Sequence, residues 1–554
     1  MFGEGTNFEG QYVGKLDSKF IQVKDIDLSS FSNWVPIGDS IVEYSFAGVY
    51  NGGNYKIENL STSREEGNGL FGYLDISHFR NMKLNNFSLN SDYSSGALSY
   101  ISSLQDDPNN LEKIVVENVS IRNLKSSSED ATGGLIAQVY NNIDVNNVNI
   151  IGGNLVSESN AGGLFSIMTS VSSIENSSFM GSINSKGSFG GIIGEVYGPR
   201  AIKNVHVNAK LTSFGETSDS IGGIIGISGG NGTIENASYY GTIFSSGNAG
   251  GIIGENNSYT ESIINVISKG SYISSGTVSS AGGIVGTANG QIKIIENAEH
   301  YGNMNGIYSV GGIIGEINSS GITIRNVISE GDYNINNEDN LDGVTGGIVG
   351  RQNSDNLSIV NSNHKGNLKS KFASGGIVGA ANGSLTIDNS HAEGDYSTWY
   401  SEEDSTVVGG LIGEQTRETS ISNSSYKGKL KDALTIGGIV GESFGKLTLE
   451  NLSAEGDIIN NNDYPTENWG FEYYQYGYGG ISGRLGRSEL TDFNLNNVDV
   501  KMTIDAYRNI GKAIGSHNFE NRTLTEEEFS FEGTIIENGL DVTDTTPDIR
   551  YQLD

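Results

Sequence analysis

Short apolar stretches alternate with polar residues along the whole chain. The most regular stretch has two glycines, two branched aliphatic residues and a third glycine, as in Gly222-Gly223-Ile224-Ile225-Gly226. An apolar stretch ending in asparagine follows, as in Ile359-Val360-Asn361, and then a third stretch such as Gly241-Thr242-Ile243-Phe244. All three are rich in β-branched residues and bounded by Gly, Asn, Asp or Ser, which predicts short β-strands. Helical periodicity is absent.

The glycine phrase repeats throughout the chain and predicts a solenoid. Complete copies begin at Gly190, Gly222, Gly250, Gly282, Gly311, Gly346, Gly375, Gly409 and Gly437, and degraded copies at Gly133, Gly162 and Gly479. We therefore predict an all-β, single-chain parallel β-helix of about 14 coils of ~28–35 residues, with three short strands per coil and capped ends. Residues 1–65 are expected to form an N-terminal cap and the first coils, residues 66–517 the repeats, and residues 518–554 a C-terminal cap.

One asparagine per repeat is as regular as the glycines. In a stacked solenoid these amides would lie above one another and bond along the axis, and asparagine tolerates the left-handed backbone of a sharp corner. The paired glycines are expected at a second corner, where φ is positive or two backbones come close. The asparagines are Asn118, Asn147, Asn176, Asn204, Asn236, Asn265, Asn297, Asn326, Asn361, Asn389, Asn423 and Asn451.

Composition excludes several classes of partner. The formal net charge of −33 opposes binding to nucleic acid and to anionic membranes. The chain has no cysteine, so disulfides and thiolate metal sites are excluded. No apolar run is long enough for membrane insertion. The first residues lack the basic and apolar regions of a signal peptide, so we expect either a mature fragment or export by another route.

Two short motifs carry a resemblance to a known family. Gly69-Leu70-Phe71-Gly72 and Gly410-Leu411-Ile412-Gly413 resemble the Gly-Leu-x-Gly repeat called the GLUG motif. The segments 34–38 and 50–57 resemble the sequence that often opens such arrays. The resemblance implies a bacterial or phage-associated extracellular protein, such as an adhesin-like surface protein or a non-catalytic part of an IgA-specific metallopeptidase. No His-Glu-x-x-His motif is present, so zinc proteolysis is excluded for this chain.

Short and long coils alternate in the second half of the chain. Long loops on every second coil have ~10 Å between them, whereas loops on every coil would meet at ~4.8 Å. The last three long segments span 331–345, 394–408 and 456–478. They contain twelve acidic residues, eleven aromatic residues and no Lys or Arg. If stacked, they would form one surface of aromatic rings flanked by carboxylates.

That surface predicts a binding site. Aromatic faces stack on sugar rings, and carboxylates accept sugar hydroxyl groups or hold calcium. Two alternatives remain open: the aromatic rings pack into a core of the loops without a ligand, or the loops form a metal or catalytic site. The candidate ligand-binding residues are Tyr396, Trp399, Tyr400, Trp469, Phe471, Tyr473, Tyr474 and Tyr476. The candidate calcium ligands are Asp339, Asp342, Glu402 and Asp404, and no other cofactor is expected.

Three functions are consistent with these features. The first is a non-catalytic, extracellular or cell-surface binding and display element, or a phage tail component, that contacts a glycan or target protein through 331–478. The second is a polysaccharide depolymerase or lyase, for which Glu330, Glu393 and Glu455 supply carboxylates at equivalent positions. The third is a structural spacer or fibre subunit. A binding element is expected to be monomeric, and a fibre component would form a homo-oligomer or join a larger assembly.

Overall fold

The protein is a parallel β-solenoid. The computed structural model describes residues 16–31, 34–38, 45–102, 112–215, 219–275, 279–335, 342–399, 405–460, 476–486, 493–517, 525 and 527–551. These residues form strands and turns and contain no helix, so none belongs to an apolar helix long enough to cross a membrane. About 16 turns are present. This confirms the predicted fold class, with two more turns than the glycine phrase indicated.

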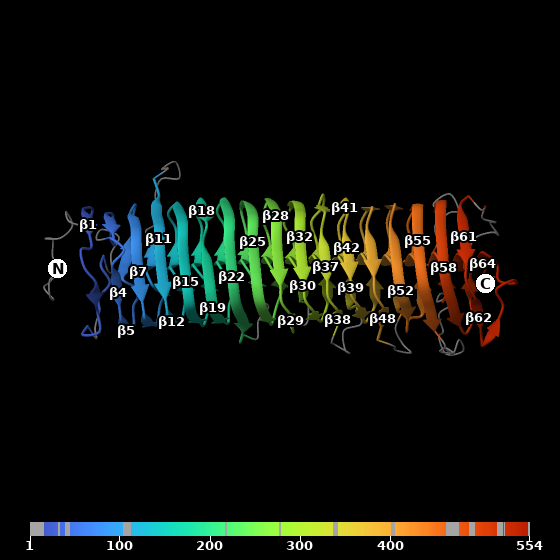
Figure 1. Ribbon diagram of the computed structural model, residues 1–554, viewed down its shortest axis with the longest axis horizontal. Helices are drawn as coiled ribbons and strands as arrows, with labels where there is room; N and C mark the ends of the chain where they lie inside the picture. Colours follow the sequence, from blue (N-terminus) through green and yellow to red (C-terminus); the bar gives the residue numbers. More distant parts are fainter. Residues whose placement is uncertain are drawn as a thin grey trace. The chain divides into compact units, whose positions relative to one another are not determined.

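The chain divides into two compact units, each of which is a stack of coils. Unit 1 contains Met1–Ser246 and Ile252–Gly254, and unit 2 contains Gly247–Gly251 and Glu255–Asp554. In both units the strands follow chain order along the stack (Figure 1). The two units are described separately below.

Each coil of unit 2 contributes strands to three parallel sheets, which we number one to three from the sheet with the most strands to the sheet with the fewest. In one coil, β34 (Ser309–Gly311) lies in sheet three and β35 (Ile314–Ile317) in sheet two. Sheet one receives β36 (Thr323–Arg325), β37 (Ile328–Glu330) and β38 (Tyr333–Ile335). The next coil repeats this order with β39 (Val344–Gly346), β40 (Val349–Gln352), β41 (Leu357–Val360), β42 (Asn363–Lys365) and β43 (Leu368–Ser370), paired in register. These two coils each have five short strands in three sheets, because two corners divide their contribution to sheet one, whereas in a later coil the same contribution is the single strand β55 (Leu447–Asn460).

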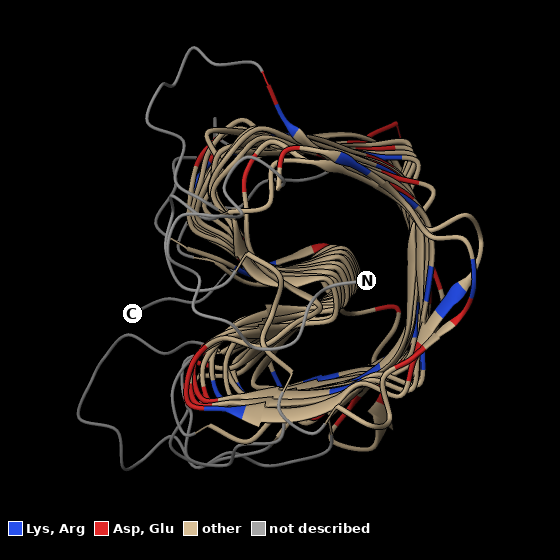
Figure 2. Cartoon of the chain, turned by 90° about the vertical axis from the view of Figure 1, so that its left-hand side faces the viewer, with Lys and Arg blue, Asp and Glu red and all other residues tan. Residues whose placement is uncertain are grey.

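The glycine phrase forms an inward fold of the coil. Viewed along the stack, the strands of sheet one form a curved outer wall, and the strands of sheets two and three turn inward between its ends (Figure 2). A Cβ atom on Gly311 would lie 1.9 Å from the carbonyl oxygen of Ile314, and one on Gly312 would lie 2.1 Å from that of Gly347. The phrase therefore requires glycine because backbones come close. The glycines with positive φ lie elsewhere, as at Gly331 in sheet one.

The asparagine ladder is confirmed. All twelve predicted asparagines have positive φ, with values from 46° to 56°. Their amides bond from coil to coil: in unit 2, Asn361 Nδ2 donates to Asn326 Oδ1 at 3.1 Å, and Asn389 Nδ2 donates to Asn361 Oδ1 at 2.7 Å. Asn423 departs from this pattern and donates to Asp388 at 2.8 Å. Each corner thus joins a left-handed backbone to an axial hydrogen bond.

The C-terminal segment continues the stack. Within residues 518–554, β61 (Phe529–Glu532) and β62 (Ile535–Glu537) pair in parallel with β58 (Phe493–Ala506), and β64 (Ile549–Tyr551) pairs with β60 (Ile514–His517). β62 also pairs with β63 (Leu540–Asp541) in the antiparallel direction. This short hairpin is the one antiparallel pairing among the described strands, and a reversed strand cannot continue a parallel coil.

Substitution of Asn361 will separate the two roles of the corner asparagine. Asn361→Gly keeps the left-handed backbone but removes both ladder bonds, so we expect a loss of about 1 kcal/mol in the free energy of unfolding. Asn361→Ala adds the left-handed strain of an L-residue and should cost about 1–2 kcal/mol more. Urea unfolding followed by circular dichroism measures both. Asn363→Ala, in the extended strand β42, is the matched control, and equal losses at the two sites would contradict the assignment.

Candidate functional surface

The strands that flank the three long segments lie at one corner of successive long coils. The first runs from Ile335, at the end of β38, to Val344, at the start of β39. The second runs from β48 (Tyr396–Thr398) to β49 (Val407–Gly409), and the third from β55 (Leu447–Asn460) to β56 (Tyr478–Gly479). The flanking strands are joined by in-register pairing through the intervening short coils. Equivalent attachment points are therefore two coils, or ~10 Å, apart.

The structure describes four of the predicted site residues. Tyr396, Trp399, Tyr476 and Asp342 lie within the described residues. The remaining candidates lie outside them, namely Tyr400, Trp469, Phe471, Tyr473, Tyr474, Asp339, Glu402 and Asp404.

Trp399 is anchored to the body of unit 2. Its indole Nε1 donates a hydrogen bond to the carbonyl oxygen of Ile335 at 2.8 Å, and its side chain is half-buried. The Nζ of Lys369 lies 3.2 Å from the centre of its ring. This contact with a cation covers one ring face. Only the other face is left for a ligand.

Asp342 lies beside a second cation–aromatic contact. Its carbonyl oxygen accepts a hydrogen bond from the Nη2 of Arg351 at 2.5 Å, and that guanidinium lies 4.8 Å from the ring centre of Tyr308. The Asp342 side chain is exposed. The described residues contain no group of three or more His, Asp or Glu side chains that could hold a metal ion. The predicted calcium site therefore stays a prediction that rests on residues outside the described part.

Tyr396 is a core residue. Its side chain is 0% exposed and its ring centre lies 5.2 Å from that of Tyr426 and 6.4 Å from that of His364. A surface ligand cannot reach it. The ring belongs to a buried column inside unit 2 whose members are stacked coil upon coil, namely Tyr272, His300, Tyr333, His364, Tyr396 and Tyr426.

This column explains the alternation of short and long coils. At one inward-facing position of sheet one, short coils have an aromatic side chain and long coils have a serine or an alanine. In register from coil to coil, the residues at this position are Ser268, His300, Ser329, His364, Ala392, Tyr426 and Ala454. All seven are buried. Four residues later, each of the first three long coils carries a tyrosine that fills the space beside its own small residue. The core packing therefore alternates with the same period of two coils as the coil lengths.

Hydrogen bonds link the column. His300 Nε2 lies 3.1 Å from the carbonyl oxygen of Gly302, which can only accept, so Nε2 carries the proton and Nδ1 accepts from Ser268 Oγ at 3.2 Å. Ser329 Oγ lies within hydrogen-bond distance of His364 Nδ1 at 3.2 Å and of Tyr333 Oη at 2.5 Å. Burial lowers the pKa of both histidines from 6.5 to about 4. Both rings are therefore neutral at pH 7.

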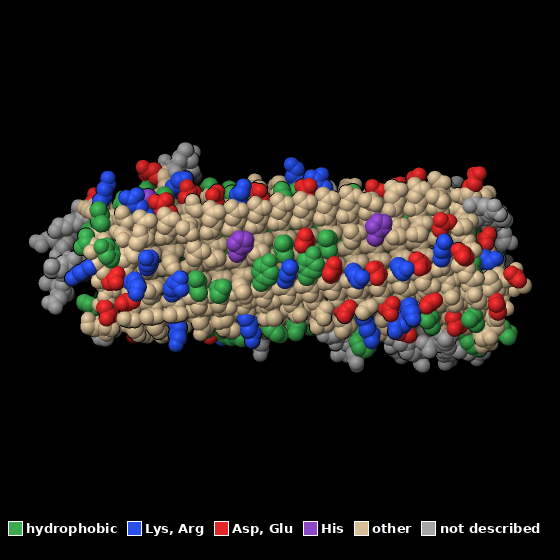
Figure 3. All heavy atoms as spheres, viewed as in Figure 1, with side chains coloured by type: hydrophobic (Ala, Val, Ile, Leu, Met, Phe, Trp, Pro, Cys, Tyr) green, Lys and Arg blue, Asp and Glu red, His purple; other side chains and the backbone are tan. Residues whose placement is uncertain are grey.

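Glu330, Glu393 and Glu455 form part of a charged stripe. They lie on the outer face of sheet one, in one row with Lys365 and Lys427. Lys365 Nζ lies 3.4 Å from a Glu393 oxygen, and Lys427 Nζ lies 2.9 Å from a Glu455 oxygen. Charges of opposite sign follow one another along this face (Figure 3). Glu393 and Glu455 are thus paired with lysines, which gives no support to an acid–base pair of a depolymerase here.

A buried acidic group lies where sheets two and three meet. We call this contact the seam: in unit 2 it joins β45 (Val378–Ala381), β50 (Ile412–Gln415), β54 (Val440–Ser443) and β57 (Ser482–Leu485) of sheet two to the facing strands of sheet three. Glu414, Glu442 and Arg484 occupy one row in register. Arg484 Nη1 donates to Glu442 Oε1 at 2.6 Å, and the Glu442 side chain is 4% exposed.

The two carboxyl groups of the seam have raised pKa values. Burial, with a smaller contribution from Glu442, raises the pKa of Glu414 from 4.5 to about 7. Burial also raises the pKa of Glu442, against the opposing effect of Arg484. The row position before Glu414 is Ala380, which packs with Val344, Ala373 and Val407. Glu414 itself is half-buried next to this apolar row position, which agrees with the direction of the shift.

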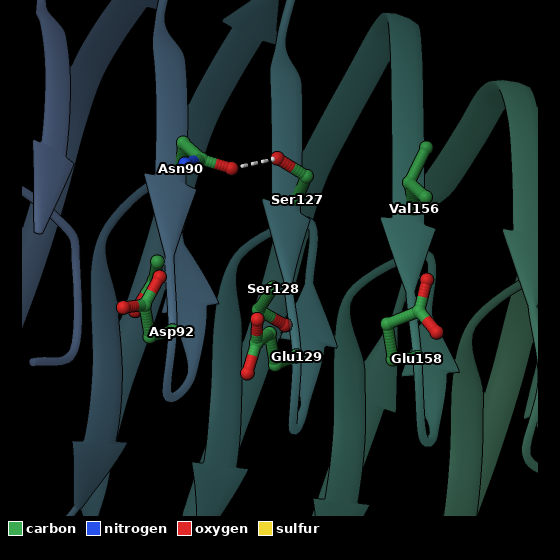
Figure 4. Close-up of a pocket in the computed structure, with 8 residues that line it drawn as sticks. Asn90, Asp92, Ser127, Ser128, Glu129, Val156 and Glu158 are labelled. Carbon is green, nitrogen blue, oxygen red and sulfur yellow. Dashed lines mark hydrogen bonds between the residues drawn. The ribbon is translucent and has the colours of Figure 1, made fainter. Parts of the chain in front are cut away.

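Unit 1 has a polar hollow on its surface. Its volume is about 540 Å³, and Asp92, Glu129 and Glu158 line it from three successive coils (Figure 4). Ser127 Oγ donates to Asn90 Oδ1 at 2.7 Å within it, and the Nζ of Lys186 is paired with Glu158. The carboxylates stand in a row one coil apart and do not converge on a point, so the hollow suits an extended polar group better than an ion.

Two of these features were missed from the sequence. The sequence shows that His300 and His364 alternate with serines at equivalent repeat positions. It does not show which face of the strand is buried. Glu442 sits in the repeat position that also holds Glu316, Arg351 and Glu414, and no sequence signal separates the buried carboxyl group of Glu442 from its half-buried equivalents.

Comparison with known proteins identifies no relative. No protein family, no curated protein and no solved structure matches the chain.

The buried histidines predict a specific loss of stability in acid. Each has a lower pKa when folded than the ordinary 6.5, so its contribution is complete above pH 6.5 and falls as the pH drops toward 4. Between pH 7 and pH 5 the loss is about 2 kcal/mol per histidine. The double variant His300→Phe/His364→Phe should therefore show a flatter pH dependence of the unfolding midpoint in urea. His391→Asn, at an exposed site, is the control; equal slopes in all three proteins would refute the prediction.

Proposed function

We propose that the protein is a non-catalytic, extracellular or cell-surface element that displays the edge 331–478 to a glycan or protein of a target surface. The observation that carries this proposal is the common corner of every second coil of unit 2 at which the strands flanking the three long segments lie. Their aromatic and acidic composition is that of a polar binding surface. The stack beneath holds their attachment points at fixed spacing, which lowers the entropy cost of presenting several contacts together.

Lys369 supports a role for Trp399 as a positioned platform. The ammonium group and the bond to Ile335 hold the indole in one orientation against the solenoid. A pre-oriented ring loses little conformational freedom when a sugar stacks on it. Trp469 lies in the most aromatic of the three segments and is proposed as the second platform.

Tryptophan substitutions will test the display surface. Binding to a glycan array should fall at least about tenfold for Trp399→Ala combined with Trp469→Ala, because each stacking contact supplies on the order of 1 kcal/mol. Trp34→Ala is the matched control, since this third tryptophan lies in unit 1 and donates its own indole hydrogen bond to the carbonyl oxygen of Gly69 at 3.1 Å. Unchanged binding by the double variant, with an unchanged melting temperature, would remove the basis of the proposal.

A structural spacer or fibre subunit is the second candidate function. It is favoured by the contact of Lys369 with the Trp399 ring, because that contact also satisfies the aromatic residue without any ligand. The two functions differ in assembly. Light scattering of the purified chain should give a monomer for a display element, whereas a trimer or filament at micromolar concentration would favour the spacer.

A further inference from the structure

Two lysines and a tryptophan lie together at the base of the second long segment. Lys369, Trp399 and Lys431 belong to three successive coils of unit 2, and we call them the corner cluster. The two lysines stand in one row of sheet one, because Lys369 pairs in register with Ser397 of β48, which pairs with Lys431 of β52 (Ser425–Lys431). They are therefore two coils, or ~10 Å, apart along the stack. Trp399 directly follows β48.

Hydrogen bonds hold the end of β48 to the coils on both sides. The backbone N–H of Trp399 donates to the carbonyl oxygen of Ser370 at 2.8 Å, and its indole Nε1 donates to that of Ile335. On the other side, the hydroxyl group of Thr398 donates to the carbonyl oxygen of Asp432. The corner cluster is thus positioned by the solenoid itself, which lowers the entropy cost of binding a ligand there.

The lysines of the corner cluster differ from other lysines of unit 2 because they lack a carboxylate partner. Among the described residues neither Lys369 nor Lys431 forms an ion pair, and Lys369 lies over the Trp399 ring instead. Lys431 is exposed and Lys369 is half-buried. Four other lysines of unit 2 are each paired with a glutamate or an aspartate, namely Lys365, Lys427, Lys429 and Lys446.

The two ammonium groups of the corner cluster act on each other. Burial lowers the pKa of Lys369, the opposite charge of Asp432 raises it, and the like charge of Lys431 lowers it. Lys369 and Lys431 are therefore within Coulomb range and repel each other. In this chain acidic residues outnumber basic ones by 66 to 33, so a carboxylate for these lysines would be easy to supply. Departures of this kind from local charge pairing are typical of functional sites.

We propose that the corner cluster binds the anionic group of an acidic glycan, a carboxylate or a sulfate, between Lys369 and Lys431 and beside the Trp399 ring. This inference rests on the proposed display function and names its ligand class. An anion at this place accepts hydrogen bonds from both ammonium groups and removes their repulsion. The indole presents apolar surface to the C–H groups of the sugar that carries the anion.

The charge of the whole chain favours a glycan over other polyanions. The net charge of −33 repels a nucleic acid or an anionic membrane, each of which would face a large part of the protein surface. A single carboxylate or sulfate on a sugar contacts only the corner cluster. At physiological ionic strength, exposed charges more than about 8 Å away are largely screened. The local ammonium groups therefore decide the sign of the interaction with such a group.

A glycan array probed with the full chain will test this inference. Uronate-containing and sulfated oligosaccharides are compared with their methyl-esterified and desulfated forms, which keep the same sugar backbone. The wild type should bind the acidic member of a pair at least about fivefold more tightly than the neutral member. This preference should decrease as the NaCl concentration rises from about 0.05 M to about 0.5 M, because salt screens exposed charges.

Lys431→Gln separates the charge of the corner cluster from the support of the Trp399 ring, because the ring is held by Lys369 and Ile335. This variant should lower the ratio of acidic to neutral binding severalfold and leave neutral binding unchanged. Lys427→Gln is the matched control. Its Nζ is paired with Glu455 at 2.9 Å, and its loss should leave the ratio unchanged.

The possible outcomes separate this inference from the proposed function. Equal binding of acidic and neutral members would overturn the inference and leave the display function standing. A preference for acidic glycans that survives Lys431→Gln, with an unchanged melting temperature, would overturn the assignment to the corner cluster. No binding to any glycan of the array would overturn both this inference and a glycan as the target of the display surface.

Discussion

The backbone hydrogen bond from one coil to the next is the constraint on which this structure depends. Because each coil pairs in parallel and in register with its neighbours, every residue stands above an equivalent residue ~4.8 Å away. Side chains stabilise this fold only if they can pack or bond against an equivalent side chain in the next coil. Amides bond along the axis, glycines let backbones meet, and lysines alternate with glutamates.

The core column of unit 2 shows how this constraint creates a period of two coils. In this column each histidine or tyrosine ring stands in register with a serine or alanine of the adjacent coils, and a serine or alanine alone is too small to fill the position. Alternation of the two solves the packing, and the tyrosine four residues later completes it. Ser329 serves both neighbours, since its hydroxyl group is bonded to Tyr333 in its own coil and to His364 in the next. The buried polar atoms thus reinforce the register that the backbone sets.

Much of the architecture could be predicted from the sequence, and most of the side-chain chemistry could not. Asn361 and its equivalents predicted the left-handed corners, because few residues other than glycine adopt that backbone conformation at low cost. The repeated glycines predicted a close approach of neighbouring backbones, because a side chain there would clash. Tyr396, by contrast, was expected on a binding surface and is buried, since its segment carries aromatic residues both inside and outside the coil. Glu414 is half-buried next to Ala380 of the preceding coil, and no local sequence pattern distinguishes it from its equivalents in other coils.

The core column of unit 2, in which large and small side chains alternate, also limits how such a chain can change length. Removing a single coil from unit 2 at the level of the gene would place His300 against His364, or Ser329 against Ala392, and leave a clash or a void. Removing or inserting two adjacent coils keeps every ring beside a small neighbour. Length variants of this molecule are therefore expected to differ by pairs of coils, or about 60 residues, so that recombination adds or removes an even number of coils.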